Sequence, residues 1–130
     1  MIEFHLNSAS GVSPYLQHVQ QTKRALRLGL LSIGDQMPTV KEVVTQLAIN
    51  PNTVLKAYRE LEYEGLVEAR QGSGTFVVRT LADASLPAHE PLRQDLRVWL
   101  SNARRAGLDP ESIEALFITT FREVLTEVAP

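Results

Sequence analysis

Cysteine is absent from this 130-residue chain, and long apolar runs are absent as well. Without cysteine the chain can form neither a disulfide framework nor a thiolate metal site. No run approaches the roughly 18 apolar residues that span a membrane, and the first residues lack the basic-then-apolar pattern of a signal peptide. We therefore expect a cytoplasmic protein with no membrane segment.

Residue patterns that would support catalysis are also missing. His5, His18 and His89 are scattered without ligand spacing, so we expect no bound metal. The Gly72-Ser73-Gly74 segment lacks the lysine and the following helix of a phosphate-binding loop. No general base is placed near Ser73 to make it a nucleophile. We expect a protein that is not an enzyme, with no catalytic residues and no cofactor.

The excess of basic residues found in many DNA-binding proteins is missing too, since the formal net charge is −2. Residues 1–80 contain 8 Lys+Arg and 7 Asp+Glu, a net charge of +1, whereas residues 81–130 contain 5 and 8, a net charge of −3. The total charge argues mildly against a nucleic-acid partner, but the distribution of charges matters more than their sum. The length suits one domain, or one small domain plus an appendage.

Residues 50–62 carry the signals of a short helix with a well-defined start. Asn50 is a good N-cap, and Pro51 follows at the first helical position, where its missing N–H costs nothing. Gly65 is placed to end the helix in the left-handed conformation. The helical period predicts a core-facing side with Val54, Tyr58, Leu61 and Gly65. It predicts an outward side with Asn52, Lys56, Arg59 and Tyr63. A polar and basic side that begins at an anchored N-terminus suits a helix that reads DNA.

A second short helix is predicted directly before this one. Thr39 and Glu42 have the spacing of a capping box, with Thr39 as N-cap and Glu42 as its reciprocal partner. The apolar residues of this helix are Val40, Val43, Val44 and Leu47. Two short helices with so tight a connection indicate a helix-turn-helix.

A β-hairpin is predicted directly after residue 65. Residues 66–70 and 75–78 are β-branched and apolar runs on either side of Gln71-Gly72-Ser73-Gly74, whose glycines can adopt positive φ. A helix-turn-helix followed by such a hairpin is a winged helix.

Residues 14–78 closely resemble the DNA-binding domain of the GntR family of bacterial transcriptional regulators. The matching segments are residues 14–17, 34–42, 50–62, 64–68 and 72–77. The short chain and the Asn50-Pro51-Asn52-Thr53-Val54 opening resemble the YtrA subfamily. Lys41 stands where the family usually has arginine, so phosphate contact is the expected role there rather than bidentate guanine reading. The resemblance implies a dimeric regulator of double-stranded DNA and control of a neighbouring transporter operon.

Asn52, Thr53 and Lys56 lie in the first two turns of the predicted reading helix, the part that reaches base edges. Asn52 is expected to read adenine, and Lys56 to meet guanine or phosphate. Roles without DNA contact remain open for two of these residues. Thr53 can act only in hydrogen bonding at the helix start, and Lys56 can be an ordinary solvated lysine. The predicted DNA-binding residues are Thr39, Lys41, Asn50, Asn52, Thr53, Lys56, Arg59, Gln71, Gly72 and Ser73.

Two further helices are predicted after a linker over residues 81–90. Their apolar sides are too broad to be buried within fifty residues, so they fold back on the winged helix or pair with a second subunit. The resemblance favours pairing, through a two-helix tail over residues 91–130. The predicted dimerisation residues are Leu96, Trp99, Leu100, Ile113, Leu116, Phe117 and Phe121.

The N-terminal part completes a predicted domain over residues 1–80. Alternating Ile2, Phe4 and Leu6 indicate an extended segment with one buried face. Ser13 and Pro14 begin a helix that ends near Gly29. Its predicted core side consists of Leu16, Val19, Leu26 and Leu30.

The expected fold class is mainly α with a small β-hairpin, a winged helix-turn-helix followed by a two-helix dimerisation tail. The expected function is a sequence-specific transcriptional regulator, a repressor that binds a two-fold symmetric operator as a homodimer. One alternative is a winged helix used for protein–protein binding, which the same fold supports. A small-molecule effector site in a cleft at the dimer interface, near Trp99 and Phe117, also stays open.

Overall fold

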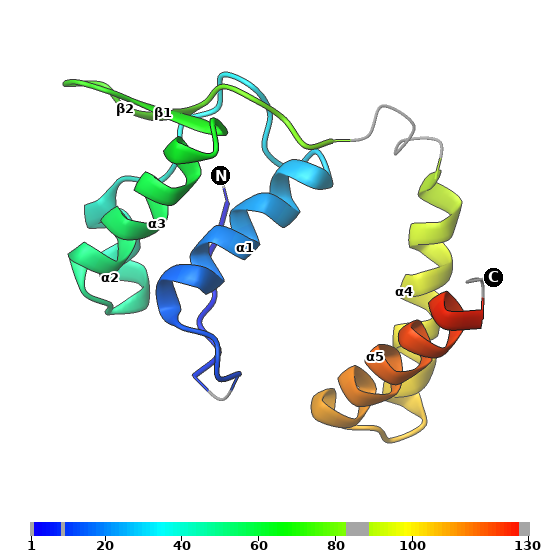
Figure 1. Cartoon of the computed structure of the whole chain (residues 1–130). Coiled ribbons are helices and arrows are strands. Elements are labelled where there is room, and N and C mark those ends of the chain that lie inside the picture. Colours follow the sequence, from blue (N-terminus) through cyan, green and yellow to red (C-terminus); the bar gives the residue numbers. More distant parts are fainter. Residues whose placement is uncertain (1, 9, 83–88, 128–130) are drawn as a thin grey trace. The chain divides into compact units, whose positions relative to one another are not determined.

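The computed structural model describes residues 2–8, 10–82 and 89–127 (Figure 1). The chain divides into two compact units, Met1–Ala84 and Ser85–Pro130. Most of the predicted linker, residues 83–88, lies outside the described residues. None of the described helices combines the length and apolarity needed to cross a membrane. The elements are α1 (Pro14–Arg27), α2 (Val40–Leu47), α3 (Pro51–Tyr63), β1 (Val67–Arg70), β2 (Gly74–Val77), α4 (Glu90–Arg105) and α5 (Pro110–Glu127).

The C-terminal unit is a pair of helices, as predicted. After α4 the chain turns at Gly107, which has φ +91°, and the Asp109 carboxylate accepts the Ser112 backbone N–H at 2.8 Å to cap α5. Among the described residues of this unit only Ala103 is buried. The apolar sides of both helices are therefore exposed within the unit.

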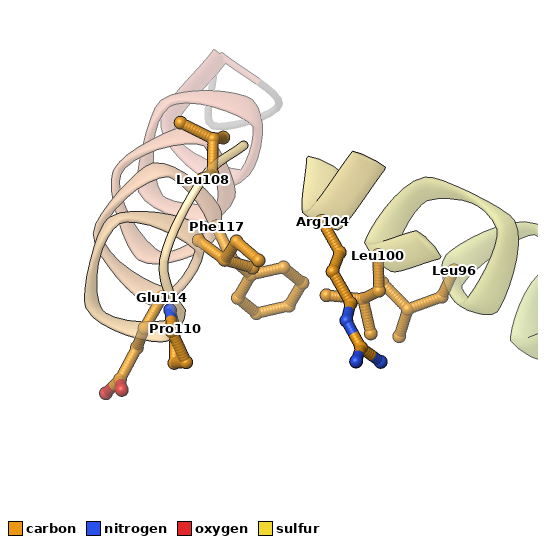
Figure 2. Close-up of a pocket in the computed structure, with 8 residues that line it drawn as sticks. Leu96, Leu100, Arg104, Leu108, Pro110, Glu114 and Phe117 are labelled. Atoms are coloured by element: carbon orange, nitrogen blue, oxygen red, sulfur yellow. The ribbon is translucent and has the colours of Figure 1, made fainter. Parts of the chain in front are cut away.

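These exposed apolar sides form a groove of about 550 Å³ along α4 and α5 (Figure 2). Phe117 points from α5 toward Leu100 of α4 in this view. The Phe117 ring also lies 6.4 Å from the Trp99 ring and 6.1 Å from the Phe121 ring, centroid to centroid. The groove is lined by Leu96, Leu100, Arg104, Leu108, Pro110, Ile113, Glu114 and Phe117.

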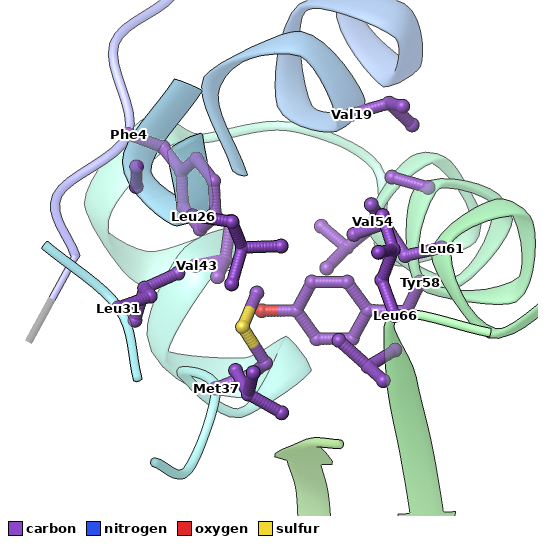
Figure 3. Close-up of a cluster of buried hydrophobic side chains, with 14 residues drawn as sticks. Phe4, Val19, Leu26, Leu31, Met37, Val43, Val54, Tyr58, Leu61 and Leu66 are labelled. Atoms are coloured by element: carbon purple, nitrogen blue, oxygen red, sulfur yellow. The ribbon is translucent and has the colours of Figure 1, made fainter. Parts of the chain in front are cut away.

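The N-terminal unit is the predicted winged helix-turn-helix. α3 packs against both α1 and α2, and β1 follows α3 and pairs with β2 in an antiparallel hairpin. Apolar residues from all of these elements meet in one core, in which the Tyr58 ring lies beside Met37 (Figure 3). The core includes Phe4, Val19, Leu26, Leu31, Met37, Val43, Val54, Tyr58, Leu61, Leu66 and Val77.

The residues before α1 form the expected extended segment with one buried face. Phe4 is buried, and its ring centroid lies 4.2 Å from that of His18. Two glutamines of α1 hold the backbone of this segment, because the amide oxygen of Gln17 accepts from Asn7 N–H and that of Gln21 accepts from His5 N–H. Burial lowers the pKa of His18.

The predicted core side of α1 is partly wrong. Leu16 is 37% exposed and Leu30 is 62% exposed. Leu30 lies beyond the end of α1 at Arg27, directly after Gly29 with φ +74°, so the helical period no longer applies to it. The buried side instead includes Thr22, whose hydroxyl donates to the His18 carbonyl at 2.9 Å and so needs no outside partner. Ser13 is the N-cap residue as predicted, but its side chain makes no capping hydrogen bond.

Candidate nucleic-acid interface

The start of α2 is capped by a threonine hydroxyl. Thr39 accepts the Glu42 backbone N–H at 3.1 Å, which confirms half of the predicted capping box. The other half differs, because the Glu42 carboxylate accepts the Thr39 hydroxyl proton at 3.1 Å instead of the Thr39 backbone N–H. The hydroxyl thus has no proton left for a phosphate. Lys41, at the second position of α2, is exposed.

The start of α3 forms as predicted. The Asn50 side-chain oxygen accepts the Asn52 backbone N–H at 2.8 Å, and Pro51 occupies the first helical position. The turn before it contains Ala48 with φ +54°, a left-handed conformation that ends α2. Asn50 and Asn52 are exposed, while Thr53 is half-buried.

The two sides of α3 divide as its period predicts. Val54, Tyr58 and Leu61 are buried, whereas Lys56 and Arg59 are exposed. We call the exposed residues Asn52, Lys56 and Arg59 the outward face of α3.

Tyr58 ties α3 to the segment that leads into α2. Its hydroxyl donates to the Pro38 carbonyl at 2.6 Å, and both residues are buried. Burial first, and the Glu42 carboxylate second, raise the pKa of Tyr58 far above its usual range. The phenol therefore stays a hydrogen-bond donor at any working pH. The helical period predicted a core position for Tyr58, but it carried no signal for this hydrogen bond.

The wing is held at its base by α3. The Glu62 carboxylate accepts the Ala69 backbone N–H of β1 at 2.7 Å. Because β1 is an edge strand, this contact satisfies a donor that no strand neighbour takes. Sequence reasoning missed this role of Glu62, since a backbone partner imposes no residue-type pattern.

The wing is held on its other side by the segment before α2. Gln36 forms an isolated bridge with Phe76, and Met37 N–H donates to the Thr75 carbonyl at 2.8 Å. The Gln36 side-chain amide donates to the Ser73 carbonyl at 3.2 Å, next to the turn that carries Gly72. The wing tip is therefore fixed by Gln36, which sequence reasoning also missed.

Charges around α3 leave the outward face positive. The two ion pairs among the described residues of this unit join Lys23 to Glu64 at 2.6 Å and Arg70 to Glu68 at 4.0 Å. Within that described part of the chain, the other basic residues of the surface form no ion pair; they include Lys41, Lys56 and Arg59.

Aromatic rings lie under two of the surface cations. The Lys56 ammonium nitrogen is 3.9 Å from the centroid of the Tyr15 ring. The Arg70 guanidinium carbon is 4.6 Å from the centroid of the Phe76 ring in the wing. Both distances are within the range of cation–π attraction. Tyr15 belongs to one of the matching segments, but its position on another helix hid this contact from sequence reasoning.

One hollow brings three elements of the surface together. It measures about 410 Å³ and is lined by Thr39 before α2, Arg59 and Glu62 of α3, and Gly74 and Thr75 of the wing, among others. The remaining predicted DNA-binding residues lie outside it on exposed turns or helix sides, except half-buried Thr53; they are Lys41, Asn50, Asn52, Thr53, Lys56, Gln71, Gly72 and Ser73.

Comparison with known proteins gives consistent matches. The family model described as bacterial regulatory proteins, gntR family, matches residues 14–77. The HTH-type transcriptional repressor YtrA of Bacillus subtilis is 33% identical over 117 residues, which cover 87% of this chain and 86% of the relative. The uncharacterized HTH-type transcriptional regulator YhcF of the same organism is 34% identical over 100 residues, covering 76% and 82%.

Solved structures agree with these sequence matches. YtrA from Sulfolobus acidocaldarius, a GntR-family transcription factor, has a TM-score of 0.54 at 26% identity, covering 78% of this chain and 97% of that chain. The DNA-binding domain of AraR in complex with operator ORX1 has a TM-score of 0.52 at 25% identity, covering 59% and 96%.

Proposed function

This chain belongs to the GntR family of bacterial regulatory proteins, and we propose that it acts as a homodimeric repressor on a two-fold symmetric operator. Residues 1–80 would bind double-stranded DNA, and residues 91–130 would form the dimer. Residues 81–90 would link these two regions. The protein would work in the cytoplasm and would not act as an enzyme. Control of a transporter operon is proposed on the resemblance to the YtrA subfamily alone.

The observation that carries this proposal is the outward face of α3. Asn52, Lys56 and Arg59 are exposed, and neither cation is neutralised by an ion pair among the described residues. A helix of this kind fits the major groove, where the first turns reach base edges. Asn52 would then read adenine, Lys56 would meet guanine or phosphate, and Thr53 would lie beside them.

Phosphate contacts complete the proposed interface. Lys41 at the exposed start of α2 supplies charge where the helix dipole is also positive. Gln71, Gly72 and Ser73 occupy the exposed wing turn, where a side-chain or backbone N–H can reach a phosphate or the minor groove. Thr39 and Asn50 support the interface as helix caps, since their side-chain oxygens already accept backbone N–H groups.

Dimerisation is proposed because the C-terminal unit cannot bury its own apolar sides. Homodimer interfaces are rich in apolar and aromatic groups, and both are exposed on α4 and α5. Two-fold pairing places the two reading helices about 34–36 Å apart, or a multiple of that distance. The residues proposed to form the interface are Leu96, Trp99, Leu100, Ile113, Leu116, Phe117 and Phe121.

The groove of the C-terminal unit supports a second role, the binding of a small-molecule effector in a cleft at the proposed dimer interface. Its volume of about 550 Å³ lies within the usual range of ligand sites, and Arg104 and Glu114 add charged groups to its apolar lining. Trp99 does not line the groove, but its ring lies near that of Phe117, and Phe117 does line the groove. Quenching of Trp99 fluorescence by candidate metabolites tests this role, and no response across a broad panel would count against it.

Selection of bound duplexes from a random DNA pool, at two salt concentrations, tests the proposed function. Enrichment of an inverted repeat is the expected result, and its spacing reports the distance between reading helices. A modest salt slope is expected because each subunit makes few phosphate contacts. A folded protein that enriches no sequence at either salt would favour the winged helix as a protein–protein module.

A further inference from the structure

The ammonium group of Lys56, on the outward face of α3, lies against an aromatic ring of another helix. Its nitrogen lies 3.9 Å from the centroid of the Tyr15 ring. Tyr15 is the second residue of α1, directly after Pro14. It is half-buried and packs against the core.

The Tyr15 ring belongs to a helix whose neighbouring side chains are buried. His18 and Val19 follow at spacings of three and four residues, and both are buried. α1 in turn packs against α3, the helix that carries Lys56. The packing of α1 on α3 therefore places the ring beside the second turn of α3.

An aromatic ring affects a lysine differently from a carboxylate. Lys23 is held by Glu64 at 2.6 Å, and that pairing cancels its charge. A ring attracts the ammonium through its electron-rich face but carries no net charge. The Lys56 ammonium thus keeps its full charge for an anionic partner, and no acceptor among the described residues takes its three N–H donors. A lysine so ordered loses less side-chain entropy when it binds than a free one.

We propose that Tyr15 is a positioning residue for DNA reading, because its ring holds the Lys56 ammonium in place on the outward face of α3. The inference rests on the proposed function of that face. Tyr15 acts through Lys56 and makes no DNA contact that its function requires. Loss of the ring therefore lowers the discrimination that Lys56 provides, while loss of the hydroxyl alone leaves it intact.

The first test needs no DNA. The side-chain methylene protons of Lys56 in the free protein should be shifted upfield by the ring current of Tyr15 in an NMR spectrum. Tyr15→Phe should keep this shift and Tyr15→Leu should remove it. Unshifted Lys56 protons in the folded wild-type protein would overturn the inference, whatever the protein binds.

The second test measures dissociation constants for the enriched inverted repeat and for a random duplex. Tyr15→Leu should weaken the specific complex by about two- to fivefold per subunit, the range of one exposed cation–π contact. Tyr15→Phe should bind like the wild type. In a Lys56→Ala background, Tyr15→Leu should cause no further loss, because its effect passes through Lys56.

Tyr63→Leu is the matched control for Tyr15→Leu, because it makes the same substitution at a tyrosine that does not contact Lys56. Tyr63 is 88% exposed and lies seven residues beyond Lys56, about 10 Å along the helix axis. Thermal unfolding of each variant establishes that it is folded at the assay temperature.

The outcomes distinguish the positioning role of Tyr15 from the proposed function of the protein. Additive losses from Tyr15→Leu and Lys56→Ala, or a loss in Tyr15→Phe equal to that in Tyr15→Leu, would overturn the positioning role while leaving sequence-specific binding intact. A wild-type protein that enriches no duplex would overturn the proposed function itself and this inference with it.

Discussion

Single side chains determine how α2 and α3 meet, and Tyr58 is the clearest case. Its hydroxyl is the donor to the Pro38 carbonyl at 2.6 Å. Tyr58→Phe should lower the free energy of unfolding by about 1–2 kcal/mol, because a buried carbonyl loses its partner. Denaturant unfolding measures the loss.

Tyr63→Phe provides the control for Tyr58→Phe. Its side chain is exposed, so removal of the hydroxyl should change stability by less than about 0.5 kcal/mol. Equal effects at the two positions would contradict the role assigned to the Pro38 contact.

His18 gives the fold a dependence on pH. Burial lowers its pKa from the ordinary value of 6.5, so the unfolded chain binds a proton that the folded chain refuses. The contribution of neutral His18 to the free energy of unfolding is fully present above pH 6.5. It falls as the pH drops from 6.5 toward the pKa of the folded state. The loss approaches about 1.4 kcal/mol per pH unit within that window.

Urea unfolding of the wild type and His18→Phe at pH 7.5 and 5.5 tests this dependence. The wild type should lose more stability than His18→Phe over this interval. His5→Phe is the control, because His5 is exposed and should keep the wild-type dependence. Identical pH profiles for the wild type and His18→Phe would contradict the assignment.

At the scale of elements, the wing depends on two glycines that differ in their surroundings. Gly72 has φ +77° with open space around it, whereas Gly74 has φ +121° and an added Cβ would lie 2.6 Å from the Gln36 side-chain nitrogen. Gly72→Ala should cost about 1 kcal/mol of stability. Gly74→Ala should cost about 2–3 kcal/mol, because its φ suits no L-residue and Gln36 must also move.

Thermal unfolding of the two variants, side by side, measures this difference. Gly72→Ala serves as the reference for positive φ without crowding. Equal losses would show that Gln36 does not constrain the wing turn.

Element boundaries were largely predictable because their signals are local. Asn50, Pro51 and Gly65 act within one turn, and in the structure α3 begins at Pro51 and ends at Tyr63, just before Gly65 with its positive φ. The core side of α1 was less predictable. Helical spacing of apolar residues selected Leu16 and Leu30, which are exposed. It could not select Thr22, a polar residue that is buried with an internal hydrogen-bond partner.

The supports of the interface were not predictable from the sequence. Gln36 and Glu62 bind backbone groups of the wing, and such partners leave no pattern in residue types. The Tyr15 ring meets Lys56 only because α1 packs against α3. The DNA contacts proposed for the exposed residues remain predictions.

At the scale of the whole molecule, the proposed dimer pairs through the apolar groove of α4 and α5. Phe117→Glu would place a charge in the proposed interface and should weaken dimerisation by at least about tenfold. Thr119→Glu is the matched control, since it adds the same charge on the opposite side of α5. Sedimentation equilibrium measures both variants, and a dimer that survives Phe117→Glu unchanged would contradict pairing through this groove.

The claim that α3 reads bases is tested most directly by dissociation constants on the enriched duplex and its single-base variants. Asn52→Ala with Lys56→Ala should lose discrimination at one or two base pairs in each half-site, by about 1–3 kcal/mol per bidentate contact. Lys41→Ala should weaken all duplexes alike. Equal losses on every duplex for the Asn52 and Lys56 variants would show that α3 is not the reading helix.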